Sequence, residues 1–123
     1  DENIIQITFT KALDIELEDA KQVSQIVREN VQPDIIYGQI VDISKINNMS
    51  REARDYFDSR PKSSVMYNAV VIKSGLQKTH ANMYFMFSNP KIETKMFNSK
   101  EDAMKWIEEN LAKSNTYKSE KRI

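Results

Sequence analysis

Hydrophobic and polar positions along the chain predict four β-strands. In the first segment apolar side chains alternate with polar ones, which is typical of a strand with one buried face. The second segment is almost wholly apolar, as expected of a strand that is covered on both faces of a sheet. The four segments are residues 3–9, 35–43, 65–73 and 92–97. In the first of them, Ile5, Ile7 and Phe9 are predicted to share one face, with Gln6 and Thr8 on the other.

Helical periodicity and capping signals predict four helices between and after these strands. The first covers residues 17–31, where apolar side chains recur every three to four positions, and it ends before Pro33. Its predicted buried positions are Ala20, Val23, Ile26 or Val27, and Val31. Residues 44–48, SKINN, are predicted to form a loop.

The other three helices begin at serine residues that can cap free backbone N–H groups. Ser50 precedes a short helix over 51–60, and Ser74 with Gln77 forms the S-x-x-Q pattern of a capping box. Ser99 opens the last helix, which is predicted to end near Leu111. The predicted buried stripe of this helix is Ala103, Trp106, Ile107 and Leu111.

Alternating strands and helices with connections too long for hairpins predict an α/β fold. Such connections favour a mostly parallel sheet with right-handed crossovers. No linker or repeat divides the chain, so residues 1–112 are predicted to form one domain. Residues 113–123 are polar and are predicted to be a frayed tail.

Composition excludes several classes of site. The chain of 123 residues has no cysteine and a single histidine, which excludes disulfides, iron–sulfur clusters and multi-histidine metal sites. With two glycines far apart it has no glycine-rich phosphate loop, and its formal net charge of zero does not favour nucleic acid. We expect no cofactor, no membrane span and a cytoplasmic location. The chain does not begin with Met, which leaves open whether residues precede Asp1.

Three stretches of the sequence carry a family resemblance: VDISKINNMSREARDYFDS at 41–59, VVIKSGLQKTHANMYFMF at 70–87 and MFNSKEDAMKWIEENL at 96–111. Together they resemble the STAS/SEC14-like (SpoIIAA-like) domains related to anti-sigma-factor antagonists, and especially an uncharacterised bacterial branch. Typical of that branch are the patterns S-R-E-A-R and F-x-S-x-E-x-A-x-x-W. The second pattern joins a strand end, a helix cap and a core Trp, and it carries no chemistry. The resemblance covers nearly the whole chain. It implies a SpoIIAA/STAS-like fold with about four mostly parallel strands and four helices.

The resemblance also implies a site after the second strand. In the antagonists a D-L-S segment ends a strand, and a phosphorylatable serine follows at the start of the next helix. In this chain Asp42-Ile43-Ser44 matches the D-L-S segment. When this segment is aligned with the antagonist pattern, Arg51 falls at the position of the phosphorylatable serine, and Ser50 lies one residue earlier. A phosphate on Ser50 would lie at a helix N-terminus near arginines, which is electrostatically favourable. The alternative, which we favour, is that Ser50 is a plain N-cap.

Asp42 and Ser44 are candidate ligand-binding residues because open α/β sheets bind ligands at the carboxyl ends of their strands. We favour the alternative that both side chains satisfy backbone amides of the loop. A Ser/His/Asp triad could be composed from Ser44, His80 and Asp42, but no G-x-S-x-G elbow accompanies it. We therefore expect that the protein is not an enzyme.

The run from Met83 to Phe87 is unusually apolar for a helix that covers one face of a sheet. Three alternatives follow: a homodimer contact, a pocket for a hydrophobic ligand, or ordinary burial. Ser74, Gln77 and His80, together with Met83 and Phe87, complete the candidate ligand- or partner-binding residues.

These features predict a non-enzymatic regulatory or protein-interaction module of unknown pathway that forms a homodimer. The alternative is a carrier or sensor of a small hydrophobic or lipid-like ligand. Both expectations depend on analogy of fold, which alone does not define a function.

Overall fold

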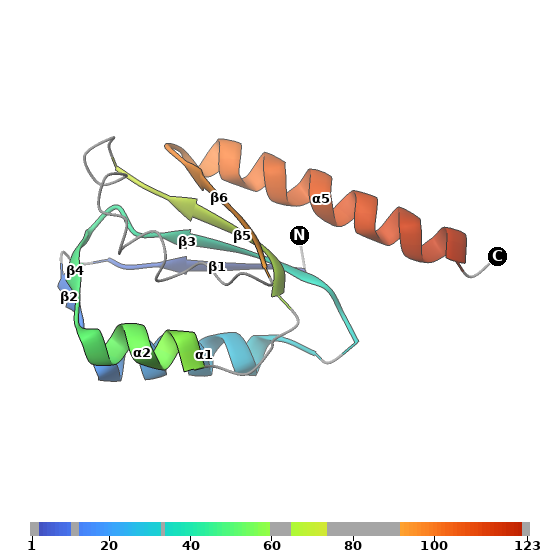
Figure 1. The fold of residues 1–123 in the computed structure, drawn as a ribbon. Helices are drawn as coiled ribbons and strands as arrows, with labels where there is room; N and C mark the ends of the chain where they lie inside the picture. The colour runs from blue at the N-terminus through green and yellow to red at the C-terminus, as the bar shows by residue number, and fades with distance from the viewer. Residues whose placement is uncertain (1–2, 11–12, 33, 60–64, 74–91, 122–123) are drawn as a thin grey trace.

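A parallel four-stranded sheet forms the centre of the protein (Figure 1). The computed structural model describes residues 3–10, 13–32, 34–59, 65–73 and 92–121. The strand order is β1-β3-β5-β6, and all three pairings are parallel. The strands are β1 (Ile4–Thr8), β3 (Tyr37–Asp42), β5 (Val65–Val71) and β6 (Glu93–Phe97). The predicted α/β class and all four predicted strands are confirmed.

Helices cover both faces of the sheet and give three layers. Helices α1 (Leu17–Asn30) and α2 (Arg51–Ser59) lie on one face, and α5 (Lys100–Lys121) lies on the other (Figure 1). This confirms the predicted helices over 17–31 and 51–60 and the predicted start of the last helix. The helix that was predicted to begin at Ser74 lies outside the described residues.

A second, smaller sheet was not predicted. Strand β2 (Leu13–Ile15) pairs in parallel with β4 (Ile46–Met49). The prediction that residues 44–48 form only a loop is therefore wrong. The backbone of β4 gains its hydrogen bonds from a segment more than thirty positions earlier, since Leu13 pairs with Ile46.

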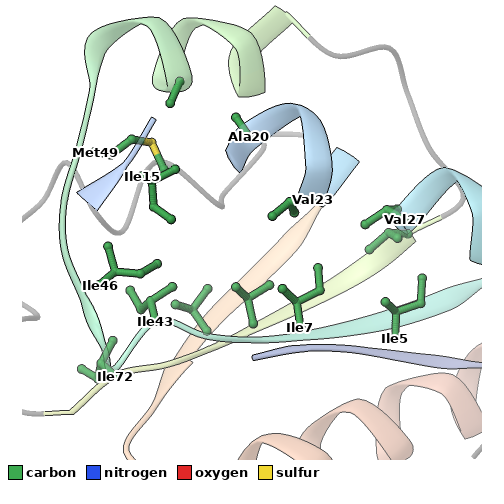
Figure 2. Packing of buried hydrophobic residues seen from close by; sticks show 14 of the residues in the cluster. Ile5, Ile7, Ile15, Ala20, Val23, Val27, Ile43, Ile46, Met49 and Ile72 are labelled. Atoms are coloured by element: carbon green, nitrogen blue, oxygen red, sulfur yellow. The ribbon is translucent and has the colours of Figure 1, made fainter. Parts of the chain in front are cut away.

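The larger part of the core lies between the sheet and the pair α1 and α2. Figure 2 shows Ile5 and Ile7 of β1 facing Val23 and Val27 of α1. This confirms the predicted faces of the first strand, because Gln6 and Thr8 are exposed. Of the two alternatives on α1, Val27 is buried, whereas Ile26 is 43% exposed. At one end of this layer Ile15, Ile46 and Met49 of the small sheet close the core (Figure 2).

A second, smaller apolar cluster lies between the sheet and α5. It consists of Ile40, Ala69, Val71, Ala103, Ile107 and Leu111. Trp106 packs against this cluster, with its ring edge-on to Tyr67 at a centroid distance of 6.2 Å. The predicted stripe of α5 and the core role of Trp106 are confirmed. Because Val41 belongs to the first cluster and Ile40 to the second, β3 is covered on both faces, as its apolar sequence predicted.

A buried polar pair joins the two central strands. Gln39 Nε2 of β3 donates a hydrogen bond to Asn68 Oδ1 of β5 at 3.1 Å, and both side chains are buried. The two residues are direct neighbours in the strand register. A slip of one residue would turn one partner to the opposite face, so the pair favours the observed register.

Helix α5 extends past its predicted end near Leu111 and continues to Lys121. The predicted end was wrong because the apolar stripe finishes at Leu111, but the following residues contain neither Gly nor Pro to stop a helix. Ser114 of this extension still contacts the sheet, with its Oγ 2.5 Å from the Tyr67 hydroxyl. Within the described part of the chain, no helix combines the length and the apolar character needed to cross a membrane.

Candidate functional site

The carboxyl ends of the four parallel strands meet at one end of the sheet. In the register, Thr8, Asp42, Val71 and Phe97 form the last row across β1, β3, β5 and β6. Helices α1, α2 and α5 also begin at this end, and the small sheet lies here on the side of α1 and α2 (Figure 1). Four of the predicted site residues, Asp42, Ser44, Ser50 and Arg51, lie here.

We call this region the carboxyl-end surface and define it by its polar side chains. Its members are Thr8, Asp42, Ser44, Lys45, Ser50, Arg51, Asn98 and Lys100.

Asp42 organises the turn that follows β3. Its Oδ1 accepts a hydrogen bond from the Ser44 backbone N–H at 3.0 Å and another from the Ser44 hydroxyl at 2.6 Å. A carboxylate that accepts from a backbone N–H two residues later is a common loop-forming arrangement. The predicted local role of Asp42 is confirmed, since it satisfies a backbone amide of the loop. A ligand-binding role for Asp42 and Ser44 stays a prediction.

Two lysines tie neighbouring loops together at the carboxyl-end surface. Lys45 Nζ donates to the carbonyl oxygen of Thr10 at 3.2 Å, which joins the turn after β3 to the segment after β1. Lys100 Nζ, at the start of α5, donates to Thr8 Oγ1 of β1 at 3.2 Å. Neither lysine was among the predicted site residues. Each follows the end of a strand by three positions, and that spacing could have placed them at this end of the sheet.

Ser50 caps helix α2. Its Oγ accepts a hydrogen bond from the Ala53 backbone N–H at 3.1 Å, and its own N–H donates to the Ile15 carbonyl oxygen at 2.8 Å. The N-cap role that the sequence favoured is confirmed. Arg51 is exposed, while the Nε atom of Arg54 is buried and has no hydrogen-bond partner among the residues that the structure describes. Phosphorylation of Ser50 stays a prediction.

Replacing Ser50 with Ala is expected to lower the free energy of unfolding by about 1 kcal/mol, because the Ala53 N–H loses its acceptor. The measurement is urea unfolding followed by the fluorescence of Trp106, the single tryptophan. Ser50→Asp is the matched control, since a carboxylate also caps a helix and should keep most of the stability. Equal losses in both variants would contradict a capping role.

The remaining predicted site residues lie outside the described part of the chain. They are Ser74, Gln77, His80, Met83 and Phe87. The homodimer contact and the apolar pocket near residues 83–87 therefore stay predictions. The triad of Ser44, His80 and Asp42, which the sequence did not favour, is not tested because His80 lies outside the described residues. Across the ranges that the structure describes, no group of three or more His, Cys, Asp or Glu side chains could hold a metal ion.

Comparisons with known proteins agree with this architecture. Residues 1–111 match the family model described as "Domain of unknown function (DUF7793)". A solved structure of an uncharacterised DUF3478-family protein from Shewanella loihica PV-4, described as having a SpoIIAA-like fold, is similar with a TM-score of 0.56. That match has 19% sequence identity and covers 78% of this chain and 79% of the other. It confirms the SpoIIAA-like fold implied by the sequence. No curated protein matches the chain.

Proposed function

This chain belongs to the DUF7793 family of domains of unknown function, and from that premise we propose that it is a non-enzymatic regulatory module that binds another protein through its carboxyl-end surface. The single observation that supports the proposal is the set of hydrogen bonds that holds this surface in place. Two of these bonds join distant segments of the chain, and the others fix the turn after β3.

Two of these bonds connect separate elements, and the third acts within one turn. Lys45 binds the segment after β1, Lys100 binds β1 from the start of α5, and Asp42 holds Ser44 in its turn. Groups fixed in this way lose little conformational entropy when a partner binds, which favours affinity. Such preorganisation suits an interaction module, and the bond from the Ser44 hydroxyl to Asp42 Oδ1 adds to it by fixing the turn after β3.

Exposed side chains at this end supply the groups that a protein partner would meet. Arg51 is exposed at the first turn of α2, and Asn98 is exposed between β6 and α5. Lys45 and Arg51 contribute positive charge beside the partial positive charge of the α2 N-terminus, although Glu52 in the first turn and Asp42 contribute carboxylates to the same region. Charges of both signs favour a polar partner surface that presents complementary groups.

Site-specific photo-crosslinking in cells tests the proposal. A photoreactive amino acid is placed at Arg51 or Asn98 and, as the control, at Glu29, which is exposed near the opposite end of the sheet. We expect the same protein to be captured from positions 51 and 98 and not from position 29. Equal capture from all three positions, or from none, would overturn the proposal. Native mass spectrometry of the purified protein adds an independent readout, because a releasable small molecule would support the carrier alternative instead.

A further inference from the structure

The outer edge of β6 has backbone groups that point away from the sheet. β6 is last in the strand order, and among the described strands it pairs with β5 alone. The Ile72 N–H donates to the Phe97 carbonyl oxygen at 2.8 Å, so the backbone groups of residue 97 face β5. Since successive residues of a strand direct their backbone groups to opposite sides, Ile92, Thr94 and Met96 direct theirs outward. This edge therefore offers N–H and C=O groups to a further strand.

Two exposed side chains of opposite charge lie along this edge. Glu93 and Lys95 are two positions apart on β6. In the register they are neighbours of Tyr67 and Ala69, which lie in or against the smaller apolar cluster, so both project from the α5 face of the sheet. Lys95 Nζ lies 5.6 Å from the centroid of the Phe97 ring, which packs against the same cluster. A carboxylate and an ammonium group therefore stand side by side on one face of the edge strand.

We propose that β6 binds the β6 strand of a second copy of this chain in an antiparallel pair centred on Thr94. This centre places Glu93 opposite Lys95 of the second copy, and the two-fold axis repeats that pair. Thr94 then lies opposite Thr94 and Ile92 lies opposite Met96, so each outward N–H meets a C=O of the other copy. Opposite charges and paired threonines directly across two antiparallel strands both stabilise a sheet.

The charge pattern favours a second copy as the occupant because the pattern complements itself. Where one strand presents a carboxylate, the antiparallel copy presents an ammonium group at the facing position. If the centre moved by two residues to Met96, Lys95 would lie opposite Phe97 and Glu93 opposite Ser99, so both ion pairs would be lost. Charged side chains on an edge strand ordinarily discourage pairing. Here they disfavour other registers and favour the one that is centred on Thr94.

Sedimentation equilibrium of the full chain, over micromolar to millimolar concentrations, provides the first test. We expect a dimer whose dissociation constant rises about tenfold or more in Glu93→Lys and in Lys95→Glu, because like charges then lie opposite each other at two places. Positions 93 and 95 are exposed, so both variants are expected to keep the wild-type circular dichroism spectrum. Lys21→Glu is the matched control, since this exposed lysine lies on α1 and its reversal should leave the dimer intact.

Restoring the opposite charges should restore the dimer. The double variant Glu93→Lys/Lys95→Glu exchanges the two charges and is expected to dimerise like the wild type. When the two single variants are mixed, one of them isotopically labelled, native mass spectrometry should show the heterodimer in excess of both homodimers. The heterodimer is favoured because it again has two pairs of opposite charge.

Thr94→Pro tests the backbone pairing. The Thr94 N–H points away from β5, and proline is tolerated on an edge strand where its N–H position faces outward. We expect the variant to fold and its dimer to weaken about tenfold or more, because the central N–H of each copy is lost. A wild-type monomer at all of these concentrations would overturn the inference, as would a dimer that survives both charge reversals or that Lys21→Glu disrupts.

This inference goes beyond the proposed function, because it concerns the edge of β6 and not the carboxyl-end surface. Loss of the dimer leaves the expected capture of one partner protein from positions 51 and 98 unchanged. The failure of either proposal is therefore distinguishable from the failure of the other.

Discussion

Replacing Gly38 with Val is expected to lower the free energy of unfolding by about 3 kcal/mol, with Gly38→Ala losing about 1–3 kcal/mol. Gly38 lies on β3 where α5 crosses the sheet, and a Cβ atom there would overlap the Cγ2 atom of Ile107. Ile107 is completely buried, and its branched side chain is held by the helix backbone. Relief of the overlap therefore requires α5 to move away from the sheet.

The cause of this effect is steric and does not involve the backbone conformation of glycine. Within the described chain no glycine has a positive φ. The absence of a side chain at Gly38 instead allows the helix to approach β3 closely. An Ala at this position should therefore be tolerated when the facing side chain becomes smaller.

A double-mutant cycle tests the contact directly. Ile107→Ala alone should cost about 2–5 kcal/mol through the cavity that it leaves. Combined with Gly38→Ala, the total loss should be smaller than the sum of the two single losses, by about 0.5–3 kcal/mol. Urea unfolding followed by Trp106 fluorescence measures each variant, because this ring packs between α5 and the sheet. Strict additivity would contradict the predicted overlap.

Replacing Ile15 with Ala is expected to lower the free energy of unfolding by about 2–5 kcal/mol. Ile15 belongs to the short strand β2, yet it is 0% exposed and packs in the larger core cluster with Ile46 and Met49 (Figure 2). Truncation to Ala leaves a cavity at the end of the core that supports the carboxyl-end surface. A loss of this size is a large part of the 5–15 kcal/mol that stabilises a typical domain.

Ile26 provides the matched control because the same substitution at a half-exposed position removes little buried surface. Ile26→Ala is expected to change the free energy of unfolding by no more than about 0.5 kcal/mol. Chemical denaturation of both variants makes the comparison. Similar losses for Ile15→Ala and Ile26→Ala would show that the small sheet is not part of the core.

Hydrogen exchange gives a second readout that links Ile15 to the candidate site. The Ser50 N–H donates to the Ile15 carbonyl oxygen, and Ser50 caps α2. Loosening of β2 in Ile15→Ala should therefore lower the exchange protection of the Ser50 amide more than that of amides in β5. An unchanged protection of Ser50 would indicate that the start of α2 is held independently of β2.

Local patterns in the sequence were enough to predict the main elements of this fold. The near-continuous apolar run at residues 35–43 predicted a strand with both faces buried, and β3 contributes Ile40 and Val41 to opposite clusters. The serines at positions 50 and 99 predicted helix starts, and both hydroxyls accept backbone hydrogen bonds. These predictions succeed because helix caps and side-chain periodicity depend on residues a few positions apart.

Part of the candidate site was also predictable. A parallel sheet places the ends of its strands together, so Asp42 and Ser44 were expected at an edge where ligands bind. The favoured alternative, that both side chains satisfy backbone amides of the loop, is confirmed for Asp42, which accepts from the Ser44 N–H. The Ser44 hydroxyl instead donates to the Asp42 carboxylate. The lysine contacts with Thr8 and Thr10 were not predictable, because they join residues 92 and 35 positions apart.

The sequence by itself therefore determined the α/β class, the four main strands, the caps of α2 and α5, and the buried stripes of the helices. Only the tertiary structure decided the pairing of β2 with β4, the choice of Val27 over Ile26, and the close approach of α5 to Gly38. A strand of three or four residues is too short to show a period of its own. Its hydrogen bonds and burial depend on partners that the fold brings near from distant parts of the chain.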